Sequence, residues 1–222
     1  MTRSRIVGTG RAVPPKKLTN DDLAKMVDTS DSWIVERTGI RERHILDPSL
    51  AASDLATEAA QKACRAAGIE PSAVDCIIVG TVTGDCPFPA TATFVQKKLG
   101  AKNAGCAFDL SAACAGFLYG VSIADSFIRT GQFKNVLVIG VEVLSRIVDW
   151  TDRATCVLFG DGAGAVLMTA DPGGVRGVLS THLFADGAQT NILWQPTGDS
   201  REPLTAKSLA TKHFFVKMNE RE

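Results

Sequence analysis

The sequence predicts an α/β protein in which helices cover both faces of a β-sheet. Residues 76–82 and 135–143 form continuous apolar runs, which are typical of strands buried on both faces of a parallel sheet. Residues 54–67 and 91–99 have apolar positions at helical spacing, and each segment ends at a glycine. Helices that alternate with apolar strands along the chain favour a layered α/β sandwich.

Shorter patterns predict the other elements. The remaining predicted strands are 4–13, 104–110 and 175–184, and the remaining predicted helices are 20–27, 31–37 and 117–130. Thr19 or Asn20 is expected to cap the first of these helices, and Gly131 to end the last. Residues 186–212 are polar and are expected to form a loop, and a short apolar segment follows at 213–218.

Residues 160–165 carry the pattern G-x-G-x-x-A, a loose form of a dinucleotide-binding fingerprint. That fingerprint needs a helix directly after the glycines, and residues 165–170 are too few to form one before Pro172. A strand, a glycine-rich turn and a second strand fit this stretch better, so we expect no nicotinamide cofactor.

The composition argues against several classes of protein. The 222 residues include 24 basic and 24 acidic side chains without a long charge run, which argues against a nucleic-acid-binding surface. Six cysteines are scattered without a CxxC pair or a spacing suited to zinc, so we expect no metal site and a reducing compartment. The sequence shows no signal-peptide pattern and no apolar run that could span a bilayer, so we expect a cytoplasmic protein without membrane association.

Cys114 is the strongest candidate for a catalytic residue. It follows the apolar run 104–110, has small neighbours, and precedes a long apolar segment at helical spacing from Phe117. Orphan N–H groups and the positive dipole end at a helix N-terminus favour a thiolate, and small neighbours leave room for a substrate. A buried, inert cysteine is the ordinary alternative, and the strand-to-helix setting favours the catalytic interpretation. The nearly all-apolar first turns also predict a helix that is buried all round.

Trp33 and Arg37 stand one turn apart on the predicted helix 31–37, and therefore on the same face. An indole beside a guanidinium offers a stacking surface and an anion partner together, which suits a nucleotide with phosphates. The charged strip at 41–44 is expected to be a solvated face.

Four segments resemble motifs of the β-ketoacyl-acyl-carrier-protein synthase III family, and they occur in the family's order. Residues 109–117 (DLSAACAGF) resemble its nucleophile motif, and residues 31–40 (DSWIVERTGI) resemble its coenzyme A-binding helix. Residues 149–153 (DWTDR) and 159–165 (FGDGAGA) match the other two motifs. The resemblance extends from about Ile6 to the last residue.

The resemblance implies a thiolase-like fold, a layered α/β/α/β/α sandwich made of two similar halves. Residues 1–173 correspond to the N-terminal half with the nucleophile cysteine, and residues 174–222 to the beginning of an incomplete C-terminal half. Near its end, where the family pattern reads Met-Asn-Gly-Arg-Glu and continues, this chain has Glu220 in place of the glycine. The His and Asn of the family's second reaction stage lie beyond Glu222, so we expect this chain alone to be inactive in condensation.

The resemblance also assigns roles to individual residues. Cys114 corresponds to the nucleophile, and Trp33 and Arg153 to the residues that flank the adenine of coenzyme A. Arg37 corresponds to a phosphate contact and Thr29 to a hydrogen-bonding residue nearby. The residues that correspond to the acyl pocket are Phe88, Leu144 and Phe159, and Phe88 is expected to reach into the second subunit of a homodimer.

The reaction implied is a decarboxylative Claisen condensation that initiates fatty-acid synthesis. Cys114 takes the acyl group from an acyl-coenzyme A, with acetyl-coenzyme A as the expected donor. Malonyl-acyl carrier protein then loses carbon dioxide, and the resulting enolate attacks the acyl-cysteine. Coenzyme A enters as a thioester substrate, and no cofactor is implied.

Two alternatives stay open on the sequence alone. One is a related acyl-coenzyme A acyltransferase of secondary metabolism. The other is a non-catalytic, truncated paralogue that dimerises with a full-length synthase.

Overall fold

The computed structural model describes residues 2–171 and 173–219, so the substitution at Glu220 lies outside the described residues. The chain forms two compact units. Unit 1 is Met1–Pro14, Leu46–Val143 and Gly162–Leu183, and unit 2 is Pro15–Ile45, Leu144–Asp161 and Phe184–Glu222. The division at residue 173 into two halves of similar fold stays a prediction.

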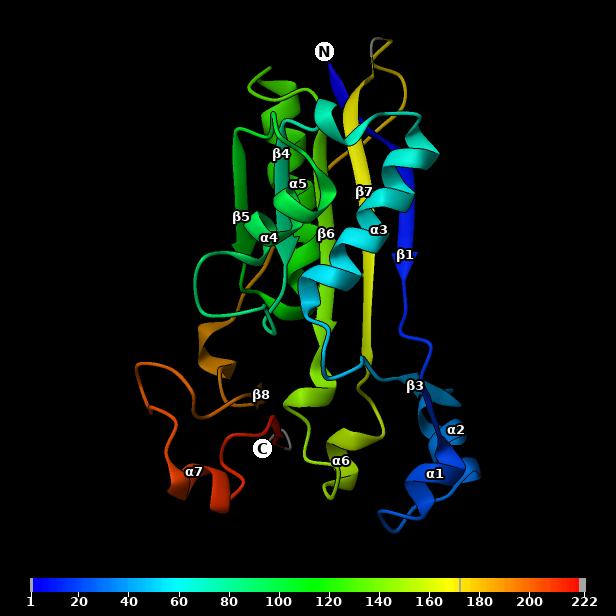
Figure 1. The fold of residues 1–222 in the computed structure, drawn as a ribbon, viewed down its shortest axis with the longest axis vertical. Helices are drawn as coiled ribbons and strands as arrows, with labels where there is room; N and C mark the ends of the chain where they lie inside the picture. The colour runs from blue at the N-terminus through cyan, green and yellow to red at the C-terminus, as the bar shows by residue number, and fades with distance from the viewer. Residues whose placement is uncertain (1, 172, 220–222) are drawn as a thin grey trace. The chain divides into compact units, whose positions relative to one another are not determined.

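Unit 1 is built on a five-stranded sheet with the strand order β1-β7-β6-β4-β5 (Figure 1). The strands are β1 (Arg3–Ala12), β4 (Cys76–Gly80), β5 (Cys106–Leu110), β6 (Val136–Val143) and β7 (Asp161–Asp171). Strand β4 runs parallel to both β5 and β6, whereas β1 runs antiparallel to β7. The apolar runs at 76–82 and 135–143 are therefore strands of a largely buried sheet, as predicted.

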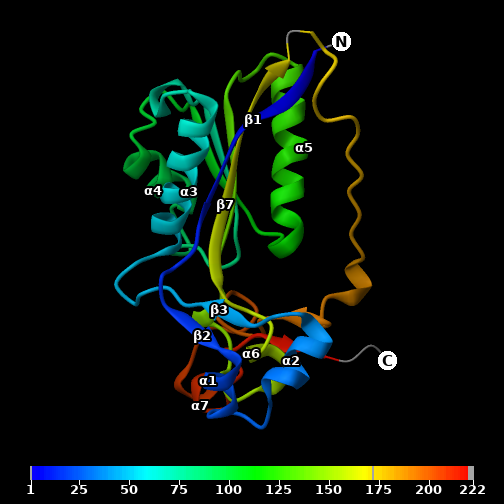
Figure 2. The same cartoon turned by 90° about the vertical axis from the view of Figure 1, so that its right-hand side faces the viewer.

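Helices cover both faces of this sheet, which confirms the predicted α/β class. The helices of unit 1 are α3 (Ala52–Ala67), α4 (Thr91–Leu99) and α5 (Gly116–Arg129), with the 3₁₀ turns η1 (Pro71–Ala73) and η2 (Ala113–Ala115). Figure 2 shows α3 and α4 on one side of the sheet and α5 on the other. Ile77 and Val79 belong to the core on the α3 side, and Cys76 and Ile78 to the core on the α5 side, because side chains alternate along a strand.

Helix α3 approaches β1 backbone to backbone. A Cβ atom on Gly10 would lie 2.1 Å from the carbonyl oxygen of Ala59, and a Cβ atom on Gly8 would lie 2.2 Å from that of Ala63. No side chain fits at either position, so the two glycines that interrupt this strand in the sequence are a requirement of helix packing.

Unit 2 consists of short elements. These are β2 (Lys17–Thr19), α1 (Asn20–Ala24), α2 (Asp31–Thr38), β3 (Glu42–His44), η3 (Leu144–Arg146), α6 (Arg153–Cys156), η4 (Gly187–Gln189), β8 (Leu193–Trp194), α7 (Ala206–Ala210) and β9 (Lys217–Met218). Strand β2 pairs with β3, and β8 pairs with β9. The fully buried side chains of Leu23 and Ile34 pack in a core with Val148 and Val157.

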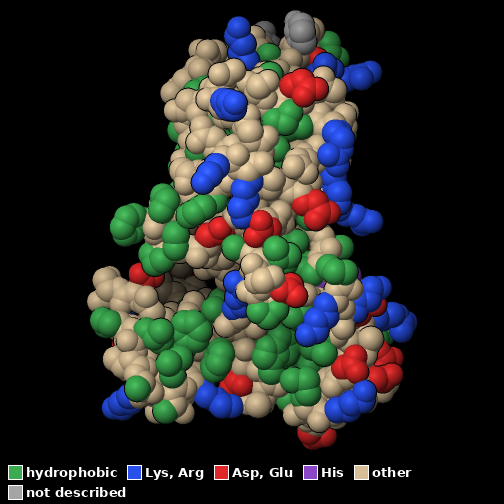
Figure 3. All heavy atoms as spheres, in the orientation of Figure 1, with side chains coloured by type: hydrophobic (Ala, Val, Ile, Leu, Met, Phe, Trp, Pro, Cys, Tyr) green, Lys and Arg blue, Asp and Glu red, His purple; other side chains and the backbone are tan. Residues whose placement is uncertain are grey.

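The surface of unit 2 is partly apolar. Figure 3 shows apolar side chains among charged ones over the part of unit 2 that carries β8 and α6. The large apolar residues of unit 2 with exposed side chains include Met26, Phe184, Leu193, Leu204, Leu209 and Met218. Across the described residues, no helix combines the length and the apolar composition needed to cross a bilayer.

Two of the predicted strands are wrong. Before the glycine-rich turn the chain forms α6 instead of a strand, because the Asp152 carboxylate accepts hydrogen bonds from Ala154 N at 3.0 Å and caps a helical turn. Residues 175–184 form no strand either. The Asp171 carboxylate accepts hydrogen bonds from the backbone N–H groups of Val175 and Arg176, at 2.9 and 3.2 Å, and this turn takes the chain out of the sheet.

The expectation of a solvated charged strip at 41–44 is wrong for Arg43, whose side chain is only 4% exposed. Its guanidinium donates to the Asn20 side-chain oxygen at 2.9 Å and to the Leu18 and Val157 carbonyl oxygens at 3.2 Å. Side chains alternate in strand β3, so the middle residue faces inward. Burial lowers the pKa of Arg43, and hydrogen bonds to three acceptors compensate for the loss of water.

Candidate active site

Cys114 lies in the 3₁₀ turn η2, between the end of β5 and the start of α5. Its side chain is exposed, whereas Cys64, Cys76 and Cys156 are buried. Ala113, directly before it, has a φ of +44°, an uncommon backbone conformation for a residue with a side chain. The strand-to-helix turn predicted from small residues therefore exists, and it presents the thiol to solvent.

Glycines bring the first turns of α5 against β4 and β6. A Cβ atom on Gly80 would lie 2.9 Å from the carbonyl carbon of Gly116, and one on Gly120 would lie 2.8 Å from a Val138 methyl group. Gly116, Gly120 and Ala124 follow at intervals of four residues and form the buried face of the helix. The position of Cys114 thus depends on close backbone packing.

The prediction that α5 is buried all round is wrong within the described residues. Leu118 in its first turns is 61% exposed, and the buried positions are confined to one face of the helix. The apolar composition that suggested complete burial therefore leaves an apolar surface next to Cys114.

Asp109, in the nucleophile-like motif, has a structural role in this fold. Its carboxylate accepts hydrogen bonds from the backbone N–H groups of Thr91 and Ala92, at 2.6 and 2.8 Å. These are the first two residues of α4, so Asp109 caps the N-terminus of that helix and places a negative charge at its positive dipole end. The cap ties β5 to α4 two residues before Ser111, where the chain leaves the strand toward the Cys114 turn.

Glu142 is a residue of the site region that the sequence analysis missed. It accepts hydrogen bonds from Val82 N at 3.0 Å and from the hydroxyl groups of Thr81 and Thr83. Burial raises the pKa of Glu142, although these hydrogen bonds oppose the shift. A single acidic residue in the apolar run 135–143 was the available signal, because a buried carboxylate must find donors.

The Glu142 network holds the beginning of the loop that carries Phe88. The Phe88 side chain is 85% exposed, and its carbonyl oxygen lies 3.1 Å from the Cys86 Sγ atom. An exposed Phe of this kind suits a contact with another molecule, and its role in an acyl pocket stays a prediction.

Trp33, Arg37 and Arg153 come together in unit 2. The guanidinium carbon of Arg37 lies 4.4 Å from the centroid of the Trp33 ring, and that of Arg153 lies 4.8 Å from it. Arg153 also donates from Nη1 to the carbonyl oxygen of Asp28 at 3.0 Å. The predicted pairing of Trp33 with Arg37 is confirmed, and two cations beside one indole form a surface that suits an anionic, planar ligand.

Thr29 adds an unsatisfied polar atom to the same unit. Its hydroxyl oxygen is buried and has no hydrogen-bond partner among the described residues. Thr29 directly precedes Ser30, whose side chain caps α2 by accepting a hydrogen bond from Trp33 N at 3.1 Å. A buried hydroxyl without a partner is costly unless a ligand or water bonds to it, which is consistent with a binding role for Thr29.

Leu144 and Phe159 are partly buried and pack against the core of unit 2. This placement is the ordinary one for apolar residues, and their acyl-pocket role stays a prediction. Of the eight predicted site residues, Cys114 and Phe88 belong to unit 1 and the other six to unit 2.

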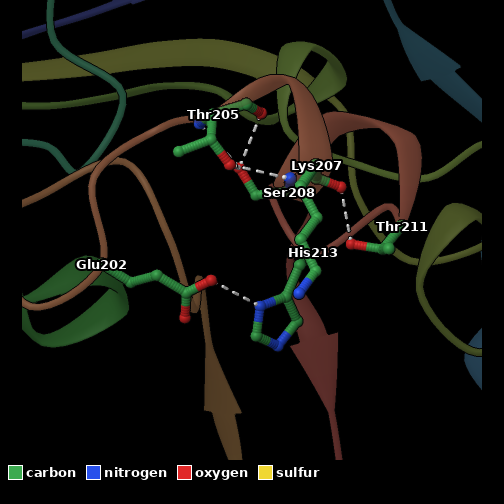
Figure 4. A pocket seen from close by; sticks show the side chains of 6 residues that line it. All are labelled: Glu202, Thr205, Lys207, Ser208, Thr211 and His213. Atoms are coloured by element: carbon green, nitrogen blue, oxygen red, sulfur yellow. Dashed lines mark hydrogen bonds and ion pairs between the residues drawn. The ribbon is translucent and has the colours of Figure 1, made fainter.

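A further hollow of about 390 Å³ lies on unit 2 (Figure 4). It is lined by Glu202, Thr205, Lys207, Ser208, Thr211 and His213, none of which is a predicted site residue. The hydroxyl groups of Thr205 and Ser208 form the capping box of α7, and His213 Nδ1 lies 3.1 Å from a Glu202 carboxylate oxygen. These contacts show that the polar groups of the hollow mainly stabilise α7.

Comparison with known proteins finds the same family. The family model for 3-oxoacyl-[acyl-carrier-protein] synthase III matches residues 108–187. A β-ketoacyl-[acyl-carrier-protein] synthase III from Xanthomonas campestris is 58% identical over 89% of this chain and 60% of its own length. The corresponding protein from Natranaerobius thermophilus is 53% identical over all of this chain and 68% of its own length. This chain thus spans about 60% to 68% of the length of these relatives.

Solved structures agree with this result. A 3-oxoacyl-[acyl-carrier-protein] synthase III from Aquifex aeolicus superposes with a TM-score of 0.82 at 45% identity, covering 97% of this chain and 64% of the other. The enzyme from Pseudomonas aeruginosa gives a TM-score of 0.86 at 38% identity, with 98% and 64% coverage. A priming β-ketosynthase from the R1128 polyketide pathway gives 0.87 at 31% identity, with 98% and 63% coverage. The thiolase-like arrangement predicted for the α/β fold is confirmed by these likenesses.

Proposed function

Because the chain belongs to the 3-oxoacyl-[acyl-carrier-protein] synthase III family, we propose that its Cys114 thiolate accepts an acyl group from an acyl-coenzyme A thioester. The observation that carries the proposal is the exposed thiol of Cys114 at the glycine-packed turn between β5 and α5. The family match at 108–187 includes this turn. Acetyl-coenzyme A is the expected donor.

In the first stage, the thiolate attacks the thioester carbonyl carbon and forms a tetrahedral oxyanion, which backbone N–H groups stabilise. Collapse of this intermediate breaks the carbon–sulfur bond to coenzyme A, whose thiolate leaves and takes up a proton. The acyl group then remains on Cys114. The adenine of the donor is proposed to lie between Trp33 and Arg153, with Arg37 contacting a phosphate group and Thr29 hydrogen-bonding nearby.

In the second stage, malonyl-acyl carrier protein loses carbon dioxide and forms an enolate. The enolate carbon attacks the acyl-cysteine, a carbon–carbon bond forms, and the Cys114 thiolate is released. The family resemblance assigns stabilisation of the enolate oxygen to His and Asn side chains in the part of the pattern that follows Glu222. Imidazole and amide groups can donate hydrogen bonds to a developing negative charge.

The product would initiate fatty-acid synthesis in the cytoplasm, and the active form is proposed to be a homodimer in which Phe88 contacts the second subunit. The relatives at 52% to 58% identity are β-ketoacyl-[acyl-carrier-protein] synthases III, which favours this function over an acyltransferase of secondary metabolism. The proposal makes coenzyme A a substrate and requires no bound cofactor.

Acylation of the full chain tests the proposal. After incubation with acetyl-coenzyme A, we expect peptide mass mapping to place one acetyl group on Cys114 and the Cys114→Ser variant to stay unlabelled. Cys86→Ser is the matched control, because Cys86 is also exposed in unit 1 and should not affect labelling. An adduct on Cys86 with Cys114 unmodified would show that the nucleophile has been misassigned.

A further inference from the structure

Asp149 is a buried carboxylate that closes the turn leading to Arg153. It is 7% exposed and accepts hydrogen bonds from Thr151 N at 2.9 Å and from the Thr151 hydroxyl at 2.7 Å. The backbone of Asp149 accepts a further hydrogen bond from Asp152 N at 3.0 Å. Asp152 caps α6, and Arg153 is the first residue of that helix. The Asp149 turn therefore fixes the position of Arg153 at the start of α6.

Lys212 completes this turn from a distant part of the sequence. Its Nζ atom lies 3.1 Å from a carboxylate oxygen of Asp149 and also donates to the Thr151 hydroxyl. Burial opposes ionisation of Asp149, but the hydrogen bonds from Thr151 and Lys212 outweigh it and lower the pKa of Asp149. A cation at this position therefore keeps the buried carboxylate charged and holds both ends of the turn.

The backbone of Lys212 is fixed for this contact. Lys212 has a φ of +58°, a conformation that L residues rarely adopt, directly after α7. Its N–H donates to Leu209 O at 3.0 Å, and the following N–H, of His213, donates to Ser208 O at 2.8 Å. This C-terminal turn of α7 directs the Lys212 side chain to Asp149.

The turn leads directly to the stacked cluster. Arg153 follows Thr151 by two residues, and its guanidinium carbon lies 4.8 Å from the Trp33 ring centroid. Lys212 contacts Asp149 and Thr151, so its effect on Arg153 passes through the turn backbone. An ordinary structural salt bridge would stabilise unit 2 as a whole, whereas this connection is specific to one arginine of the cluster.

We propose that Lys212 and Asp149 are positioning residues that hold Arg153 beside Trp33 and thereby set the affinity for the nucleotide end of coenzyme A. The inference rests on the proposed function, because it takes the Trp33 cluster as the nucleotide site. It adds a determinant of donor selectivity that lies outside that cluster. Loss of the Lys212–Asp149 pair weakens the binding of ligands that contain the nucleotide. The binding of ligands that end at pantetheine stays unchanged.

Calorimetric titration of the full chain with coenzyme A and with pantetheine tests the inference. For Lys212→Met we expect the Kd for coenzyme A to rise about three- to tenfold, the range set by partial loss of a cation–π contact and a phosphate pairing. The Kd for pantetheine should change less than about twofold. Lys212→Arg, which keeps the charge, should retain most of the affinity. Lys207→Met, which changes an exposed lysine of α7, is the matched control.

A thermodynamic cycle with Arg153→Ala separates the possible outcomes. If Lys212 acts through Arg153, Lys212→Met should change the Kd for coenzyme A little in a chain that already carries Arg153→Ala. Thr151→Val removes only the bridging hydroxyl and serves as a milder variant if Lys212→Met does not fold. It should also weaken coenzyme A more than pantetheine, by a smaller factor than Lys212→Met.

Equal weakening of coenzyme A and pantetheine would overturn the inference and leave Lys212 a structural residue. The inference would also be overturned if Arg153→Ala raised the Kd for coenzyme A while Lys212→Met and Thr151→Val left it unchanged. In that case the proposed nucleotide site would stand. If Arg153→Ala left the Kd for coenzyme A unchanged, the proposed nucleotide site would be wrong. The positioning role of Lys212 and Asp149 would then be wrong as well.

Discussion

The two units position their candidate site residues by different means. In unit 1, the Cys114 turn depends on backbone packing, because glycines let α5 lie against β4 and α3 against β1. In unit 2, the residues around Trp33 depend on side-chain hydrogen bonds made by Arg43, Asp149 and Asp152. Added volume should therefore disturb unit 1 most, and lost hydrogen bonds should disturb unit 2 most.

The largest effect is expected for Gly10→Ala in unit 1. A Cβ atom there would lie 2.1 Å from Ala59 O, which belongs to a helix backbone that cannot rotate away. We expect the free energy of unfolding to fall by about 3 kcal/mol, at the upper end of the range for overpacked sites. Urea denaturation measures this loss.

Gly164→Ala is the matched control for Gly10→Ala. Gly164 lies on β7 beside Arg11, in the strand pair that contains Gly10, and a Cβ atom on it would meet nothing within 4 Å. Its effect should stay within about 0.5 kcal/mol. A similar stability for both variants would show that α3 shifts freely on β1. It would contradict the claim that unit 1 is the more sensitive unit to added volume.

A smaller effect is expected for Arg43→Lys in unit 2. A single ammonium group cannot reach the Leu18, Asn20 and Val157 oxygens together as the guanidinium does. At least one buried acceptor loses its donor, so we expect a loss of about 1 to 2 kcal/mol in the free energy of unfolding. Arg41→Lys, two residues away and exposed, should change stability little in the same denaturation experiment. Equal losses in the two variants would mean that the Arg43 hydrogen bonds do not stabilise unit 2.

The elements that the sequence predicts well are those whose signal is local. Continuous apolar runs identify β4 and β6 because strands buried on both faces need no polar positions. Trp33 and Arg37 were found because helical spacing alone places them together. Small residues around Cys114 likewise indicate a tightly packed turn.

The features that the sequence analysis missed depend on partners that are remote in the chain. Thr83 and Glu142 are 59 residues apart, and Lys212 and Asp149 are 63 residues apart. Arg43 was expected in solvent because the oxygens that accept its hydrogen bonds belong to Asn20, Leu18 and Val157, which lie 23, 25 and 114 residues away in the chain. The segment 175–184 was expected as a strand because apolar residues suggest one, whereas the Asp171 turn before it decides the direction of the chain. Local patterns carry no information about such partners.

The finest distinction between the units lies in two carboxylates whose pKa values move in opposite directions. Burial of Glu142 raises its pKa above the ordinary 4.5, and the donors that it has among the described residues, Thr81, Val82 and Thr83, are neutral. Burial acts in the same sense on Asp149, but the hydrogen bonds from Thr151 and Lys212 prevail and hold its pKa below the ordinary 3.8.

These shifts predict opposite pH dependences for two neutral variants. The native state binds the Glu142 proton more tightly than the unfolded chain does, so ionisation of Glu142 lowers stability as the pH rises above 4.5. Glu142→Gln removes this loss and keeps an acceptor oxygen for Val82 N, so its stability relative to the parent should improve from about pH 4 to about pH 7.

Asp149 releases its proton more readily in the native state, and its stabilising contribution is lost as the pH falls below 3.8. Asp149→Asn should therefore be most destabilised near neutral pH and approach the parent in acid. Urea midpoints measured from about pH 2 to about pH 7 test both signs. Parallel curves for the two variants would show that charge at these sites does not distinguish the two units.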